Sequence, residues 1–188
     1  MTDTPDVARQ FDVLQAFRLI DSLLTAGPSL ESLLALRDRL AGELLSDADR
    51  VASTLADNFE LRTVTGGSST TTDRDALIKS IRRQSEAGGE AMMWMELEDL
   101  VVGESALAGQ GLLRMLRAAP GATTDGQSDN ETVCAHLTSI PLAFFLRFER
   151  ALMTSEVIFM EGPLPESSVL HTAALPSIAQ LGVLLNQA

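Results

Sequence analysis

The stretch from Ser46 to Gln84 constrains the fold of this chain most. Its pattern predicts a short helix, a strand that ends at Gly66 and Gly67, and a second helix. A block rich in strand-forming residues, 91–161, follows it. Helices that precede a run of long strands are typical of α+β folds. We therefore expect a curved, mostly antiparallel sheet wrapped around N-terminal helices, a cone that encloses a pocket.

Two hydroxyl residues are expected to cap helices in this stretch. Ser46 with Asp49, and Thr72 with Asp75, both have the spacing of a capping box. The second pair starts a helix that ends near residue 87, and this helix should pack on the sheet together with an earlier helix over residues 30–45.

Glycine and proline mark the turns and bends of the expected sheet. Gly66 and Gly67 predict a hairpin turn, because the segment lacks both the lysine–serine/threonine ending of a phosphate-binding P-loop and a full glycine fingerprint. Gly109, Gly111 and Pro141 suit bulged, strongly bent strands.

Two further segments of the strand block need an interpretation. Residues 142–153 could form a helix after Pro141, but the neighbouring Phe144 and Phe145 favour a strand. The polar segment 121–132 is expected to be a mobile loop.

Additional helices flank the cone at both ends of the sequence. Thr4, Pro5 and Asp6 predict the start of a first helix, which runs to about Thr25 before Gly27. A last helix is expected over residues 178–185. We therefore expect an N-terminal helical extension (1–28), a cone-shaped α+β domain (29–162), and a C-terminal tail with a short helix (163–188).

Composition excludes several classes of partner. The formal net charge is −12, from 26 acidic and 14 basic residues, which disfavours binding to nucleic acid or to an anionic membrane. No apolar run approaches the roughly 18 residues of a membrane span. Cys134 is the single cysteine, so the chain forms no internal disulfide. A cytoplasmic location is expected.

Three segments resemble the nuclear transport factor 2-like superfamily, and within it the polyketide-cyclase (SnoaL-like) branch. They are Leu36-Arg-Asp-Arg-Leu40, Val51-Ala-Ser-Thr-Leu-Ala-Asp-Asn-Phe59 and Thr72-Asp-Arg-Asp-Ala-Leu-Ile78. The resemblance implies a cystatin-like cone of helices against a curved sheet. It also implies a homodimer formed through the outer face of the sheet, and a small apolar ligand inside the cone.

The family spans several functions, so two hypotheses remain open. One is an acid–base isomerase, cyclase or lyase that acts on a small apolar molecule. The alternative is a non-catalytic binding or assembly module with the same fold. A deep pocket with at least two convergent ionisable groups would favour the enzyme, and a filled cone would favour the module.

Ionisable residues on the expected strands are the catalytic candidates. The resemblance to epoxide-hydrolase-like members implies an acid–arginine–acid set inside the cone. A histidine acting with an acid would suit the cyclase branch. The candidates are His136, Glu96, Glu98, Arg114 and Arg147. Cross-strand ion pairs on the outer face, and a histidine at the rim, are the non-catalytic alternatives.

Apolar strand residues are the candidates for a ligand-binding wall. Trp94, Met92 and Phe145 are the residues expected to contact a ligand, although methionine-rich segments also fill cores. The chain has no tyrosine, so a carbonyl cannot be polarised by a tyrosine hydroxyl. No metal or cofactor is expected, because two histidines and one cysteine show no ligand spacing.

Overall fold

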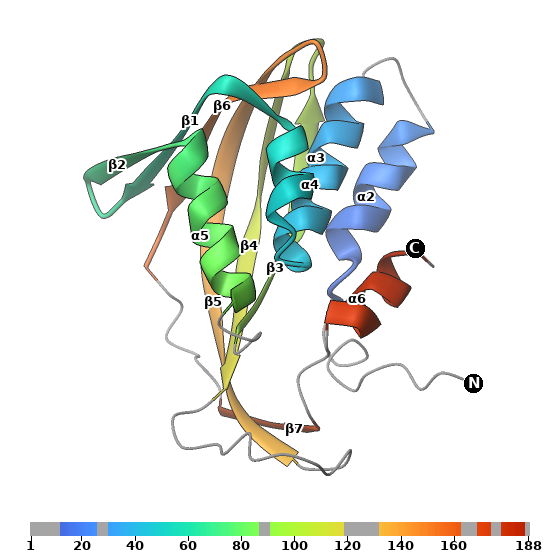
Figure 1. Cartoon of the computed structure of the whole chain (residues 1–188), viewed down its shortest axis with the longest axis vertical. Coiled ribbons are helices and arrows are strands. Elements are labelled where there is room, and N and C mark those ends of the chain that lie inside the picture. Colours follow the sequence, from blue (N-terminus) through green and yellow to red (C-terminus); the bar gives the residue numbers. More distant parts are fainter. Residues whose placement is uncertain are drawn as a thin grey trace.

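The computed structural model describes residues 12–25, 30–86, 91–118, 132–162, 169–173 and 178–186. Helices cover one face of a curved sheet of long strands (Figure 1). The helices are α2 (Gln15–Leu24), α3 (Leu30–Leu44), α4 (Ala48–Ser53), α5 (Arg74–Glu86) and α6 (Ile178–Leu185). The strands are β1 (Leu55–Thr65), β2 (Ser68–Asp73), β3 (Ala91–Val102), β4 (Ala106–Ala118), β5 (Thr132–Glu149), β6 (Leu152–Met160) and β7 (Val169–Ala173).

The described strands form one mostly antiparallel sheet, as the sequence predicts. Their order is β2-β1-β6-β5-β4-β3, and β7 pairs with the first residues of β5. Strand β1 pairs in parallel with β6, and every other pairing is antiparallel. The parallel pair joins segments that lie far apart along the chain. It places the hairpin of β1 and β2 at one edge of the sheet.

Strand β5 shows which face of the sheet is buried. Leu142, Phe144, Leu146 and Phe148 are buried toward the helices, whereas the residues between them point outward and are exposed. The prediction of a strand after Pro141 is therefore confirmed. The strand turns into β6 at residues 150 and 151, which both have positive φ.

A bulge in β3 interrupts its antiparallel pairing with β4. The register shifts between Leu97 and Asp99, and Gly111 of β4 lies opposite Leu97. A Cβ atom at Gly111 would lie 2.0 Å from the carbonyl oxygen of Glu96, so only glycine fits this close approach. Gly66 and Gly67, with φ of 56° and 84°, form the expected hairpin turn.

The two predicted helix caps are wrong by one residue each. Asp47 caps α4, and its Oδ1 accepts a hydrogen bond from the Arg50 amide at 3.0 Å. Asp73 caps α5 by accepting from the Ala76 amide at 2.8 Å. The expected cap Ser46 instead has a positive φ of 52° in the turn, and the expected cap Thr72 pairs with β1.

The terminal helices agree only in part with expectation. The structure places α6 at the expected residues. Helix α2 begins at Gln15, because residues 12–14 form a turn, so the prediction of an unbroken helix from Thr4 is wrong. Residues 1–11 and most of the expected loop 121–132 lie outside the described residues. No described helix combines the length and apolar character that a bilayer crossing requires.

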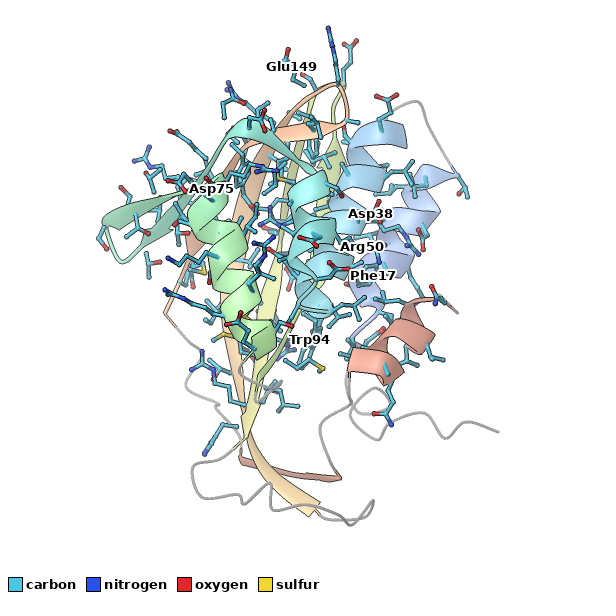
Figure 2. The ribbon with its side chains drawn as sticks, viewed as in Figure 1. Phe17, Asp38, Arg50, Asp75, Trp94 and Glu149 are labelled. Carbon is cyan, nitrogen blue, oxygen red and sulfur yellow. The ribbon has the colours of Figure 1, made fainter. Side chains whose placement is uncertain are left out.

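The helical layer is joined by ion pairs on its exposed side and by the core beneath. Arg50 of α4 meets Asp38 of α3 at 2.6 Å (Figure 2), and Arg37 of α3 meets Asp21 of α2 at 2.7 Å. Pairs as exposed as these contribute only about 0–1 kcal/mol. Burial of the apolar faces of α2, α3 and α4 against the sheet therefore supplies most of the stability.

Candidate active site inside the cone

A cavity of about 150 Å³ lies between the helices and the inner face of the sheet. Most of its wall is hydrocarbon. The apolar lining residues are Ala16, Phe17, Leu36, Leu40, Leu44, Leu61, Leu77, Met93, Trp94, Met95, Leu113, Leu142, Phe144, Leu146, Met153, Ile158 and Met160. Arg39, Glu43 and Glu156 are the charged residues among the described lining.

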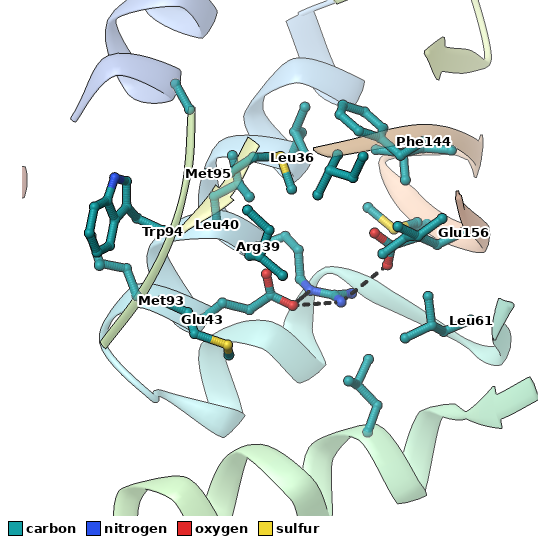
Figure 3. A pocket seen from close by; sticks show the side chains of 18 of the residues that line it. Leu36, Arg39, Leu40, Glu43, Leu61, Met93, Trp94, Met95, Phe144 and Glu156 are labelled. Atoms are coloured by element: carbon teal, nitrogen blue, oxygen red, sulfur yellow. Dashed lines mark hydrogen bonds and ion pairs between the residues drawn. The ribbon is translucent and has the colours of Figure 1, made fainter. Parts of the chain in front are cut away.

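These three residues form a linked set that we name the triad. Nε of Arg39 donates to Oε1 of Glu43 at 2.8 Å, and Nη2 of Arg39 donates to Oε2 of Glu156 at 3.2 Å (Figure 3). The guanidinium also lies over the ring of Phe59, 5.7 Å from its centroid. Arg39 is therefore held between two carboxyl groups and an aromatic face.

The triad is assembled by helix and strand periodicity. Arg39 lies on the inward face of α3 with Leu36 and Leu40, and Glu43 follows one turn later. Glu156 lies on the inner face of β6, opposite the buried Leu146. Two elements that are distant in sequence thus bring two carboxyl groups and a guanidinium to one cavity.

The two carboxyl groups of the triad differ in how far they are buried. Glu156 is 8% exposed, and loss of water raises its pKa above the ordinary value, although Arg39 works in the opposite direction. The side chain of Glu43 keeps 32% of its surface exposed and pairs with Arg39. Burial lowers the pKa of Arg39, but the two carboxylates outweigh that effect and raise it, so Arg39 stays charged.

Several lining residues are half-buried, namely Glu43, Leu61, Leu77, Met93, Met95, Leu113, Ile158 and Met160. Glu156 is buried, so it is the more enclosed of the two carboxyl groups that line the cavity.

Three of the sequence-predicted residues form a separate cluster on β3 and β4. Arg114 pairs with Glu96 at 2.9 Å and also bonds Ser139, and Nε1 of Trp94 donates to Glu96 at 3.2 Å. This is a cross-strand ion pair, the alternative considered for these charges. Trp94 contributes to the cavity wall, but its indole ring lies on the far side of β3 from Arg39 (Figure 3).

The remaining predicted residues do not border the cavity. Phe145 and Arg147 lie on the outer face of β5, where the guanidinium is 5.5 Å from the ring centroid. Glu98 is exposed in the β3 bulge, and His136 is half-buried near the start of β5, opposite Arg117. Met92 is buried in the core.

Sequence reasoning missed all three members of the triad as functional residues. A usable signal existed in Leu36-Arg-Asp-Arg-Leu40, where Arg39 shares a helical stripe with leucines and Asp38 does not. Glu156 carried a weaker signal, a single charge in the apolar strand 152–160. Among the described residues, no group of three or more His, Cys, Asp and Glu side chains is arranged to hold a metal ion.

The chain matches no protein-family model and no curated protein. It is similar to solved structures. An epoxide hydrolase from M. tuberculosis, described as LEH-like, is 13% identical over 70% of this chain and 79% of its own, with a TM-score of 0.52. A putative SnoaL-like polyketide cyclase from Shewanella denitrificans is 14% identical over 71% of this chain and 91% of its own, also with a TM-score of 0.52.

A third similar structure is a nuclear transport factor 2-like protein from Burkholderia xenovorans, 11% identical over 71% of this chain and 91% of its own, with a TM-score of 0.49. At such low identity these similarities concern the fold alone. The first two, whose TM-scores exceed 0.5, confirm the expected fold of helices packed against a curved, mostly antiparallel sheet.

Proposed function

We propose that the cone binds a small, mostly apolar molecule and that the triad performs acid–base chemistry on it. The supporting observation is a buried arginine between two carboxyl groups in a cavity that is otherwise apolar. Removing such charges from water costs several kcal/mol per ion, and apolar replacements are often as stable or more so. Stability therefore does not explain the triad, whereas catalysis would.

The two carboxyl groups have environments that suit opposite roles. Glu156, whose pKa is raised by burial, is the general acid and gives its proton to an oxygen of the substrate. Glu43, which contacts solvent, is the general base and takes a proton from water or from a substrate carbon. The step leaves Glu43 protonated and Glu156 ionised. Arg39 touches both and stabilises the negative charge in either state.

Proton balance is restored through the exposed carboxyl. Glu43 releases its proton to solvent, and Glu156 takes up a proton before the next turnover. Addition of water to a strained ring and isomerisation beside a carbonyl both fit this scheme, because each moves one proton to oxygen and one away from water or carbon.

The similar structures support the same class of reaction. One is described as an epoxide hydrolase and another as a putative polyketide cyclase. The triad is an acid–arginine–acid set of the kind that the resemblance to epoxide-hydrolase-like proteins implies, although other residues supply it here. Small epoxides and cyclic ketones are therefore the first substrates to test.

The experiment compares turnover of these compounds by the wild-type protein and by E156Q, which keeps the shape of the side chain but removes its acidity. We expect E156Q to lose activity by about 100-fold or more, as expected for loss of a general acid. The matched control is E149Q, because Glu149 is an exposed glutamate on the outer face of β5. Equal turnover by E156Q and the wild type would refute the acid role. Binding without turnover would support the non-catalytic module.

We also propose that the chain forms a homodimer through the outer face of the sheet. Val101, Ala108, Phe145 and Val157 form one row across four strands, and Val101 and Phe145 are 69% and 37% exposed. Phe159 lies beside this row and is 52% exposed. Such a continuous apolar strip is more than a solvated face needs. Light scattering at micromolar concentration should give a dimer, and F159E should weaken it. A wild-type monomer would contradict the proposal.

A further inference from the structure

A second depression lies at the end of the sheet where β5 turns into β6, and its lining shares no residue with that of the cavity. It is open to solvent and has a volume of about 550 Å³, within the roughly 300–1,000 Å³ of small-molecule sites. Glu149 marks this end of the sheet in Figure 2. The polar lining residues are Asn58, Ser105, Arg147, Glu149 and Thr154, and Phe145 is the exposed aromatic residue beside them.

Two breaks in strand pairing meet at this depression. The register of β1 against β6 shifts between Leu55 and Glu60, and that of β5 against β6 shifts between Arg147 and Phe148. Thr154 of β6 is left without a paired residue on either neighbouring strand. Bulges occur often beside functional sites, where they change the direction of a side chain. The break in β1 contains Asn58, which lines the depression together with residues of β5 and β6.

The guanidinium of Arg147 is supported on one side but not neutralised. Its central carbon lies 5.5 Å from the ring centroid of Phe145. The Thr154 hydroxyl donates to the Arg147 carbonyl oxygen at 3.3 Å and so ties the backbone here to β6. Among the described residues no carboxylate forms an ion pair with Arg147. A supported guanidinium with free N–H groups is suited to holding a carboxylate by two parallel hydrogen bonds.

We propose that this depression is a second binding site, which takes the carboxylate group of a small organic acid. Arg147 is the main partner of the carboxylate, and the amide of Asn58 and the hydroxyl of Ser105 are further donors on the same lining. The hydrocarbon part of the acid lies against Phe145. The site faces away from the cavity, so this inference does not depend on the chemistry proposed for the triad.

The charges at the depression favour a ligand with a single negative charge. Glu149 lines the same depression and is exposed, and the whole chain has a net charge of −12. A dianion such as a phosphate monoester would be repelled more strongly than a carboxylate. A neutral molecule would gain no charge-assisted bond from Arg147. An ammonium group on the ligand would add little, because an exposed ion pair with Glu149 is weak.

Three probes of similar size test the proposal by calorimetry with the whole chain: 3-phenylpropanoate, its neutral amide, and phenethyl phosphate at a pH where the phosphate carries two charges. We expect the carboxylate to bind at least about 10-fold more tightly than the amide, because its oxygens accept from a charged donor. It should also bind more tightly than the phosphate. Equal affinity of carboxylate and amide, or tighter binding of the phosphate, would overturn the proposal.

A matched pair of variants locates the site. R147Q should lower the affinity for 3-phenylpropanoate to that of the amide, a loss of at least about 10-fold. R150Q is the control, because Arg150 is an exposed arginine in the adjacent turn that is absent from the described lining. It should change the affinity by less than about 2-fold. An unchanged affinity in R147Q, or an equal loss in both variants, would overturn the assignment to Arg147.

The oligomeric state is controlled separately, because Phe145 also belongs to the row proposed for the dimer. F159E should weaken that dimer, and Phe159 is absent from the lining of the depression. Binding of 3-phenylpropanoate by F159E with the same preference over the amide would support the site in the monomer. Failure of both the wild type and F159E to bind the carboxylate would overturn the proposal and leave the chemistry of the cavity unaffected.

Discussion

Replacement of Arg39 by methionine should destabilise the protein strongly, and the loss should depend on pH. The arginine is 3% exposed and neutralises Glu156, which is 8% exposed. Removing one partner of a buried ion pair costs about 3–5 kcal/mol, because the other charge stays buried without compensation. For a chain of this size that loss lowers Tm by roughly 6–20 °C. Chemical denaturation followed by circular dichroism measures it.

The pH dependence follows from Glu156, which stays buried when Arg39 is replaced. Without the cation, burial raises the pKa of Glu156 further, so the carboxyl becomes neutral at a higher pH than in the wild type. The free energy of unfolding that R39M loses relative to the wild type should therefore become smaller as pH falls from 7 toward the ordinary carboxyl range near ~4.3. A loss that is constant over this range would show that the pKa of Glu156 does not depend on Arg39.

A double variant separates this coupling from simple loss of packing. R39M/E156L replaces both charges by apolar groups and should cost no more than R39M alone, because such replacements are often neutral. The control is R50M, whose arginine is 34% exposed and pairs with Asp38 at the surface. It should cost less than about 1 kcal/mol. If the effects of R39M and E156L simply add, the reasoning about a coupled buried pair is refuted.

Two further predictions concern pH and the sheet. Burial raises the pKa of Glu156, so its stabilising contribution is complete below the unfolded pKa and is lost as pH rises through the folded pKa. In denaturation experiments, the difference in stability between E156Q and the wild type should therefore shift in favour of E156Q as pH rises through that window. G111A should lower the free energy of unfolding by about 3 kcal/mol or more, because its Cβ would clash with the Glu96 carbonyl oxygen. The matched variant G182A, in open space on α6, should be neutral or stabilise by up to about 1 kcal/mol. Equal losses for both glycine variants would contradict the bulge.

The fold could be predicted because its signals are local. Alternation along β5, the glycine pair at the β1–β2 turn, and the apolar face of α3 each depend on a few neighbouring residues. The caps were misplaced by one residue because serine, threonine and aspartate all cap helices well. The end of the preceding turn or strand decides between adjacent candidates.

The site could not be predicted because it depends on long-range pairing. Glu156 faces the cavity only through the register of β6 against β5 and its parallel pairing with β1, and a shift of one residue would turn it outward. Glu96 and Arg114 have the same residue types and the same alternating pattern, yet they form a separate ion pair. Residue type and spacing alone do not distinguish these two sets.

The protonation state of Glu156 in the folded protein tests most directly whether the triad contains a general acid. Carbon-13 NMR of glutamate-labelled protein follows each carboxyl with pH, and the signal missing from E156Q identifies Glu156. The buried position predicts that this carboxyl keeps its proton above the ordinary glutamate pKa of ~4.3. Ionisation of Glu156 at or below that ordinary pKa would contradict its role as the acid.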